Sequence, residues 1–153
     1  TNRLVGSEMC IRDSYKMDKI QDSEIETLLK MTNNESTQII TQEFIEDIYE
    51  GDFRILIIHG KPFKKTLARI PQGDSFKGNL AAGGKGVVKD ISDFQFEMAS
   101  EIGDFLIQKD INFAGIDVIG NFLTEINVTS PTCARQILDQ SGENPIQEYF
   151  EKL

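Results

Sequence analysis

The sequence predicts an α+β domain made of an antiparallel sheet, helices on one face of it, and one long loop. Runs of β-branched and aromatic residues, which suit strands, alternate with segments whose apolar residues recur at helical spacing. The stretch from Pro71 to Gly86 holds five glycines and only two large apolar side chains, so it predicts a mobile loop without packed structure. With 153 residues, 39% of them apolar, the chain is long enough for the core of one domain.

The first part of the chain predicts a tail, a helix and three strands. Residues 1–14 show neither helical nor strand periodicity, so we expect them to lie outside the fold and the domain to cover 15–153. Asp22 or Ser23 can cap a short helix, which the polar run at 32–34 then ends. Strands are predicted where β-branched and aromatic residues gather, at 37–44, 53–60 and 66–70.

The second part predicts a long helix, a hairpin and two short helices. Ser92 and Gln95 form a capping-box signal before apolar residues at helical spacing, which predicts a helix over 92–108. The segment 111–128 reads as an antiparallel hairpin that turns at Gly120 and Asn121. Two further helix starts are predicted, at Ser130 with Pro131 and at Asn144 with Pro145.

Charge and composition exclude several classes of partner. A net charge of −9 argues against nucleic acid and against an anionic membrane, and no apolar run is long enough to span a membrane. Cys10 and Cys133 match no metal or disulfide framework, which favours a reducing, cytoplasmic location. Eight of the sixteen basic residues lie between Arg54 and Lys89 beside one acid, Asp74. This island indicates either a local anionic ligand or a solvated basic surface.

The hairpin carries a candidate metal site. Asp117, Glu125 and Asn127 are polar residues in an otherwise apolar segment. A three-residue loop over 120–122 places Asp117 opposite Glu125 with Asn127 on the same face, whereas a two-residue loop puts the two carboxylates on opposite faces. We therefore predict the longer loop and a hard oxygen site suited to Mg²⁺. The alternative is that these side chains only decorate a solvent-facing sheet.

The glycine-rich loop could cover a phosphate group. Lys77 and Lys85 lie in it and Arg69 precedes it, so backbone N–H groups and cations could act together on an anion. The loop lacks the glycine spacing of the known phosphate-binding motifs, so a surface linker is the alternative. We expect His59 to be a turn residue and Cys133 a packing residue rather than catalytic groups.

Four motifs resemble the prokaryotic glutathione synthetase family: LARIPQG at 67–73, GNLAAGGKG at 78–86, GIDVIG at 115–120 and LTEINVTSPT at 123–132. The resemblance covers about 16–153 and implies the carboxyl-terminal lobe of an ATP-grasp domain, with 70–85 as a lid over the active site. It implies ATP-dependent ligation of γ-glutamylcysteine to glycine through an acyl-phosphate. It also implies Mg²⁺, or Mn²⁺ in its place, and a homo-oligomer at full length.

The resemblance also implies roles for single residues. Arg54 and Arg69 would hold the transferred phosphoryl group, and Asp117, Glu125 and Asn127 the metal. Contacts to the nucleotide are implied for Gln42, Glu43, Phe44, Ile45, Asp52, Gly83, Gly84 and Lys85. Contacts to the peptide substrate are implied for Arg69, Lys77, Asn127, Ser130 and Thr132.

Two departures from the family pattern lead to further expectations. Lys77 and Lys85 stand where the family carries arginine, which keeps the charge but loses the bidentate fork, so lid closure is expected to be weaker. The family's substrate domain and nucleotide-binding lysines should precede residue 15, so we expect the chain to be inactive alone. Another ATP-grasp ligase and a non-catalytic nucleotide-binding module are the alternatives.

Overall fold

The protein forms two compact units, residues 1–46 and 47–153. The computed structural model describes residues 3–6, 15–17, 21–73, 75–78, 80 and 83–153, with side chains from residue 15 onward. Among the described helices, none is long and apolar enough to cross a membrane. Each unit is described by itself below.

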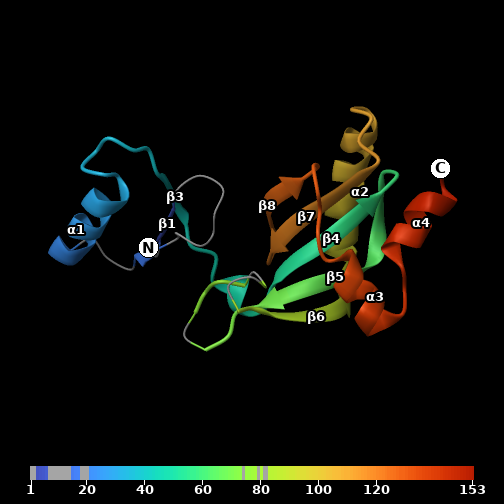
Figure 1. Ribbon diagram of the computed structural model, residues 1–153, viewed down its shortest axis with the longest axis horizontal. Coiled ribbons are helices and arrows are strands. Elements are labelled where there is room, and N and C mark those ends of the chain that lie inside the picture. The colour runs from blue at the N-terminus through green and yellow to red at the C-terminus, as the bar shows by residue number, and fades with distance from the viewer. Residues whose placement is uncertain (1–2, 7–14, 18–20, 74, 79, 81–82) are drawn as a thin grey trace. The chain divides into compact units, whose positions relative to one another are not determined.

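The first unit contains a small antiparallel sheet and one helix (Figure 1). Its strands run in the order β2-β1-β3, and their bounds are β1 (Arg3–Gly6), β2 (Tyr15–Met17) and β3 (Ile40–Glu43). Residues 3–6, which we expected to lie outside the fold, pair with both neighbouring strands. Helix α1 (Asp22–Met31) has Gln21 as its N-cap, one residue before the predicted caps, and the Gln21 N–H donates to Glu24 Oε2 at 3.2 Å.

The second unit is built on a five-stranded antiparallel sheet in the order β6-β5-β4-β7-β8. The strands are β4 (Asp52–Ile58), β5 (Lys61–Ile70), β6 (Lys85–Asp90), β7 (Phe113–Ile119) and β8 (Phe122–Asn127). The helices are α2 (Asp93–Ile107), α3 (Ala134–Ser141) and α4 (Pro145–Glu151). A short 3₁₀ helix, η2 (Glu46–Tyr49), spans the boundary between the two units.

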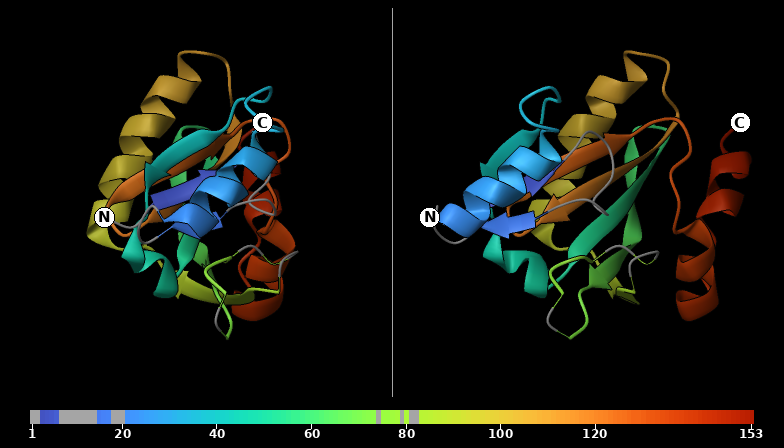
Figure 2. Two further views of the ribbon diagram at one scale, coloured as in Figure 1. Left: turned by 90° about the vertical axis from the view of Figure 1, so that its left-hand side faces the viewer. Right: turned by 60° about the vertical axis from the view of Figure 1, so that its left-hand side comes forward.

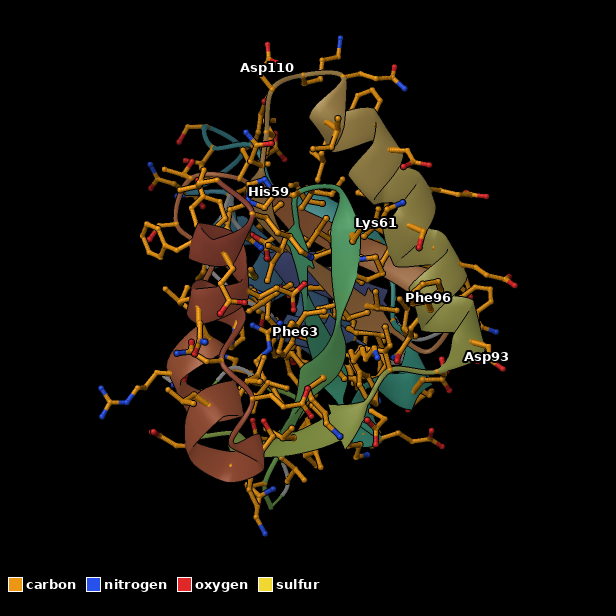
Figure 3. The ribbon with its side chains drawn as sticks, turned by 90° about the vertical axis from the view of Figure 1, so that its right-hand side faces the viewer. His59, Lys61, Phe63, Asp93, Phe96 and Asp110 are labelled. Carbon is orange, nitrogen blue, oxygen red and sulfur yellow. The ribbon has the colours of Figure 1, made fainter. Side chains whose placement is uncertain are left out.

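Helices cover both faces of this sheet, where the sequence predicted only one (Figures 2 and 3). On one face α2 packs Ala99 and Leu106 against Ile55, Ile57 and the alternate apolar residues of β7. On the other face Ile137 of α3 and Tyr149 of α4 join the cluster around Leu56, Ile58, Phe63 and Leu67. Because side chains alternate along β4, its successive residues supply the two cores in turn.

The helix-start signals hold for two of the three helices in this unit. Ser92 caps α2, accepting from the Gln95 N–H while Gln95 Oε1 accepts from the Ser92 N–H, which confirms the predicted capping box. Asn144 caps α4 as predicted, with Pro145 in the first turn. Helix α3, however, begins three residues beyond Pro131, after Cys133 at a φ of 85°. The segment 128–133 is thereby left free of regular structure beside the candidate site.

The turn between β4 and β5 fixes the position of α2 and α4. His59 and Gly60 have positive φ and form this turn, as predicted for His59. A Cβ added at Gly103 of α2 would lie 2.3 Å from the Gly60 carbonyl oxygen, so the helix and turn touch backbone to backbone. On the other side, the His59 ring stacks on Tyr149 of α4, with the ring centroids 4.9 Å apart.

The glycine-rich segment is packed at one point. Its described residues form no strand before Lys85, as expected of a loop. Gly78 is nevertheless buried, and a Cβ there would lie 2.6 Å from the Arg69 carbonyl oxygen. Our expectation that this loop lacks packed structure is therefore wrong at Gly78, where the absence of a side chain lets the loop lie against β5.

Candidate active site

The hairpin of β7 and β8 pairs Asp117 with Glu125, but through a loop and a bulge that differ from the predicted loop. Ile119 pairs with Phe122, so the loop has two residues rather than the predicted three. A bulge then places Asp117 opposite Glu125, as predicted. The extra residue, Thr124, donates its hydroxyl hydrogen to the Asp117 carbonyl oxygen at 3.1 Å. The bulge restores the register that a plain two-residue turn would have lost.

Four charged side chains lie side by side on the face of the sheet that carries α3. Asp52 and Arg54 come from β4, and they lie two residues apart and therefore on the same face. Arg69 of β5 is opposite Asp52, and Asp117 of β7 is opposite Arg54. All four are between 2% and 6% exposed. Burial of this depth is tolerated only because opposite charges are in contact.

Asp117 is the centre of this buried network. Arg54 forms two hydrogen bonds to Asp117: Nε donates to Oδ1, and NH2 donates to Oδ2 at 2.8 Å. Arg69 NH2 also lies 2.8 Å from Asp117 Oδ2, and 2.5 Å from Asp52 Oδ2. Two arginines thus share one carboxylate, and the second carboxylate, Asp52, has Arg69 as its one ion-pair partner among the described residues.

Two polar atoms of the network have no partner among the described residues. They are Asp52 Oδ1, an acceptor, and Arg69 Nε, a donor. Buried polar atoms are usually paired, so these two are available for a ligand that offers both a donor and an acceptor.

The pKa values of the two carboxylates shift in opposite directions. Burial would raise the pKa of Asp117, but hydrogen bonds and charge from Arg54 and Arg69 outweigh burial and lower it. Burial raises the pKa of Asp52 to about 6, because the charge of Arg69 offsets only part of it and the nearby Asp117 adds to the rise. Despite burial, the carboxylates raise the pKa of both arginines, which stay charged.

Glu125 and Asn127 extend the site toward the open edge of the sheet. Glu125 is exposed and Asn127 is half-buried. With the Asn127 amide oriented to satisfy its neighbours, its nitrogen donates to Glu125 Oε1 at 3.0 Å and its oxygen accepts from Arg54 NH2 at 3.3 Å. Arg54 NH1 points to Thr132 Oγ1 at 3.4 Å. Arg54 therefore contacts three groups to which the sequence assigned metal or substrate roles.

The donor set fits a hard cation in part. Glu125 offers exposed carboxylate oxygens and the half-buried Asn127 offers an amide oxygen, both of the kind that Mg²⁺ prefers. Both Asp117 oxygens accept from arginines, so Asp117 would have to release one of them to bind a metal. Within the described part of the chain, no three His, Cys, Asp or Glu side chains converge as a metal site. The metal roles of all three residues stay predictions.

The other predicted site residues lie in several places. Ser130 and Thr132 are exposed on the segment after β8, while Lys77 is half-buried and Gly83, Gly84 and Lys85 lead into β6. Gln42 to Ile45 belong to the first unit, in which Phe44 is buried beneath the Lys16 ammonium group, 3.9 Å from the ring centroid. No role was predicted for Thr66, whose hydroxyl donates to the Arg54 carbonyl oxygen at 2.8 Å. A buried threonine facing a charged strand residue was the only available signal.

Comparison with known protein families shows which family the chain belongs to. The model of the prokaryotic glutathione synthetase ATP-grasp domain matches residues 14–142. This chain belongs to that family. Curated glutathione synthetases are similar to it: that of Nitrosomonas europaea is 50% identical over 120 residues, and that of Xylella fastidiosa (strain 9a5c) 45% over 123 residues. These matches cover 78% and 80% of this chain, but only 37% and 39% of the relatives.

Solved structures show the same fold. The ATP-grasp ligase PsnB, solved with a minimal precursor, Mg and ADP, superposes with a TM-score of 0.65 at 11% sequence identity. The match covers 99% of this chain and 44% of PsnB. At this identity the likeness concerns the fold alone. The family member described here thus has the α+β fold of an ATP-grasp domain, as the sequence predicted.

Proposed function

We propose that this chain provides the phosphoryl-transfer site of a glutathione synthetase, which joins γ-glutamylcysteine to glycine with conversion of ATP to ADP and phosphate. The observation that carries the proposal is the contact of Arg54 with Asp117, Asn127 and Thr132 in a protein of this family. These contacts join the buried ion pair of Arg54 and Asp117 to Asn127, a candidate metal ligand, and to Thr132, a candidate substrate contact.

The arginines are suited to stabilise a transferring phosphoryl group. The peptide carboxylate would attack the γ-phosphorus of ATP, and the glycine amine would then attack the acyl carbon and release phosphate. Negative charge concentrates on the phosphoryl oxygens in the first step. Arg54 and Arg69 are already oriented by Asp117 and need little reorganisation when that charge develops. Mg²⁺, when bound at Glu125 and Asn127, would neutralise further phosphate charge.

The loop before β6 is proposed as the lid over this site. Gly78 already lies against Arg69 and beside Asp52, where its added Cβ would be 3.5 Å from the Asp52 Cβ. Lys77 and Lys85 would bring positive charge toward the phosphates. A covered site protects an acyl-phosphate from water. The nucleotide contacts proposed for residues 42–45 and for Asp52, a homo-oligomer and a cytoplasmic location stay predictions.

A chimera tests the proposal, because the matched relatives are much longer than this chain. The segment of this chain that matches the Nitrosomonas europaea glutathione synthetase replaces its counterpart there, and ADP release is measured with ATP, Mg²⁺ and γ-glutamylcysteine. We expect release that depends on glycine. Release that needs another amine, such as glutamate, would show a different ligase, and nucleotide binding without release would show a non-catalytic module.

Two variants of the chimera separate the site from the scaffold. Glu125→Gln should lower glycine-dependent release by about 100-fold or more. Glu101→Gln, an equal charge change on the exposed side of α2, should leave it unchanged. Full activity of the Glu125 variant would contradict the proposed metal role.

A further inference from the structure

Gly115 occupies a position in β7 where backbone conformation does not require glycine. It lies in the middle of the strand, paired with Leu56 of β4 on one side and with Asn127 of β8 on the other. Its φ is not positive, so any residue could adopt its backbone conformation. Glycine inside a strand weakens the strand, and it often marks a site where another group approaches closely.

Two groups approach Gly115 from different parts of the chain. A Cβ added there would lie 2.9 Å from Pro131 Cβ and 3.0 Å from Arg54 Cδ. Neither distance is tolerated without movement. Pro131 belongs to the irregular segment 128–133 that follows β8, and Arg54 to β4. Both therefore pack over the same Cα, in space that a side chain would fill.

This close approach decides how far Arg54 lies from the candidate substrate groups. Arg54 is held on one side by two bonds to Asp117. On the other side its NH1 reaches Thr132, the residue after Pro131, at 3.4 Å, which is already long for a hydrogen bond. A displacement that moves Arg54 and Pro131 apart would break this contact.

We propose that Gly115 is a positioning residue that sets the separation between the Arg54 guanidinium group and the segment 128–133. It does so by having no side chain, so that Arg54 lies flat on β7 with Pro131 and Thr132 against it. The importance of this for catalysis rests on the proposed function, but the geometric claim does not.

A second strand glycine provides a matched control. Gly86 of β6 also has no positive φ, and a Cβ there would meet Leu80 Cδ2 at 3.2 Å and Leu67 Cδ2 at 3.3 Å. These atoms are the ends of flexible side chains, which can give way. Gly86→Ala therefore introduces the same methyl group into the same sheet without pressing on Arg54.

The test measures Arg54 directly, in this chain and without any ligand. In the ¹⁵N-labelled protein, water exchange of the Arg54 Nε–H is measured by NMR, with the signal assigned by its loss in Arg54→Lys. In Gly115→Ala the added methyl group presses on Arg54 Cδ, the atom bonded to Nε, and should weaken the bond from Nε–H to Asp117 as the side chain shifts away from Thr132. We therefore expect this exchange to speed up about tenfold, as for the loss of one hydrogen bond. Gly86→Ala should leave it unchanged. So should Val118→Ala, which weakens the core on the opposite face of the sheet.

A rescue variant distinguishes positioning from general destabilisation. Pro131→Gly removes the atom nearest to the added methyl group, so Gly115→Ala with Pro131→Gly should return the exchange rate toward that of the wild type. If Gly115→Ala alone does not fold, the double variant should. Unchanged exchange in Gly115→Ala, equal acceleration in the controls, or a double variant that is not rescued would overturn the proposal. An inactive chimera with these NMR results would instead count against the proposed function alone.

Discussion

Asp117 is the residue on which the buried charges depend. It accepts from both Arg54 and Arg69, whereas in the described part of the chain Asp52 accepts from Arg69 alone. The removal of a carboxylate from such a site leaves two buried cations with one anion. A buried cation without a partner is costly, because the protein interior does not replace the favourable hydration free energy that the cation loses.

Neutralising Asp117 should therefore reduce stability strongly. For Asp117→Asn we expect the free energy of unfolding to fall by about 3 kcal/mol or more, measured by urea denaturation at neutral pH. Glu125→Gln serves as the comparison, because Glu125 is exposed, and should change stability by no more than about 0.5 kcal/mol. Equal effects of the two variants would show that Asp117 is not the centre of the network.

Asp52 should make stability depend on pH between about 4 and 6. Its pKa rises from 3.8 to about 6 on folding, so the folded state binds its proton more tightly than the unfolded state. Its contribution is complete below pH 4 and is lost as the pH rises through 6, a change on the order of 3 kcal/mol. Asp117, with a lowered pKa, acts in the opposite sense and only below about pH 4.

Asp52→Asn should remove this dependence. Urea unfolding of both proteins from pH 4 to 7 should show the wild type losing stability relative to the variant up to pH 6, and no further change above it. Parallel curves across the whole range would contradict the raised pKa of Asp52.

The contact between α2 and the β4–β5 turn should make Gly103→Ala destabilising, although helix propensity alone would make it stabilising. Gly103→Ala should gain up to about 1 kcal/mol from propensity. The added Cβ would lie 2.3 Å from the Gly60 oxygen, however, and backbone cannot move aside as a side chain can. We expect a net loss of about 2 kcal/mol in unfolding free energy, because α2 must lift from the sheet. Glu97→Ala, on the exposed face, should be nearly neutral.

The loop before β6 should loosen when its packed glycine is replaced. Gly78→Ala places a methyl group 2.6 Å from the Arg69 carbonyl oxygen, so the loop must move away from β5. Trypsin should then cleave after Lys77 several-fold faster than in the wild type. Gly86→Ala is the comparison, because its φ is not positive and a methyl group there meets only the ends of the Leu80 and Leu67 side chains. Equal cleavage of both variants would show that Gly78 does not hold the loop.

The elements of the second unit were largely predictable, because their signals are local. The Ser92 capping box and the apolar spacing after it predicted α2 to within a residue at each end. The hairpin loop was not predictable in the same way. Asp117 faces Glu125 through a two-residue turn and a bulge at Thr124, and a bulge depends on contacts across strands rather than on its own residue. The pairing of Asp117 with Glu125 was thus predicted correctly, although the predicted loop length was wrong.

At the scale of the molecule, motif order predicted the family but not the charge network. The sequence assigned Asp117 to a metal and the arginines to a phosphoryl group, and did not pair them. That pairing follows from the register of β4 against β7, which no local pattern in Arg54 or Asp117 indicates. Likewise, the pairing of residues 3–6 with β2 and β3 was not predicted, because residues 1–14 show no strand periodicity of their own.

We propose that Glu125 and Asn127 bind a divalent cation beside the buried arginines. The direct measurement is paramagnetic broadening of the ¹⁵N-labelled chain by substoichiometric Mn²⁺ in place of Mg²⁺, in the wild type and in Glu125→Gln. We expect Mn²⁺ to broaden the backbone amide signals of residues 115–117 and 125–127 in the wild type, and not in Glu125→Gln. Broadening centred elsewhere, or unchanged at 125–127 in Glu125→Gln, would contradict it.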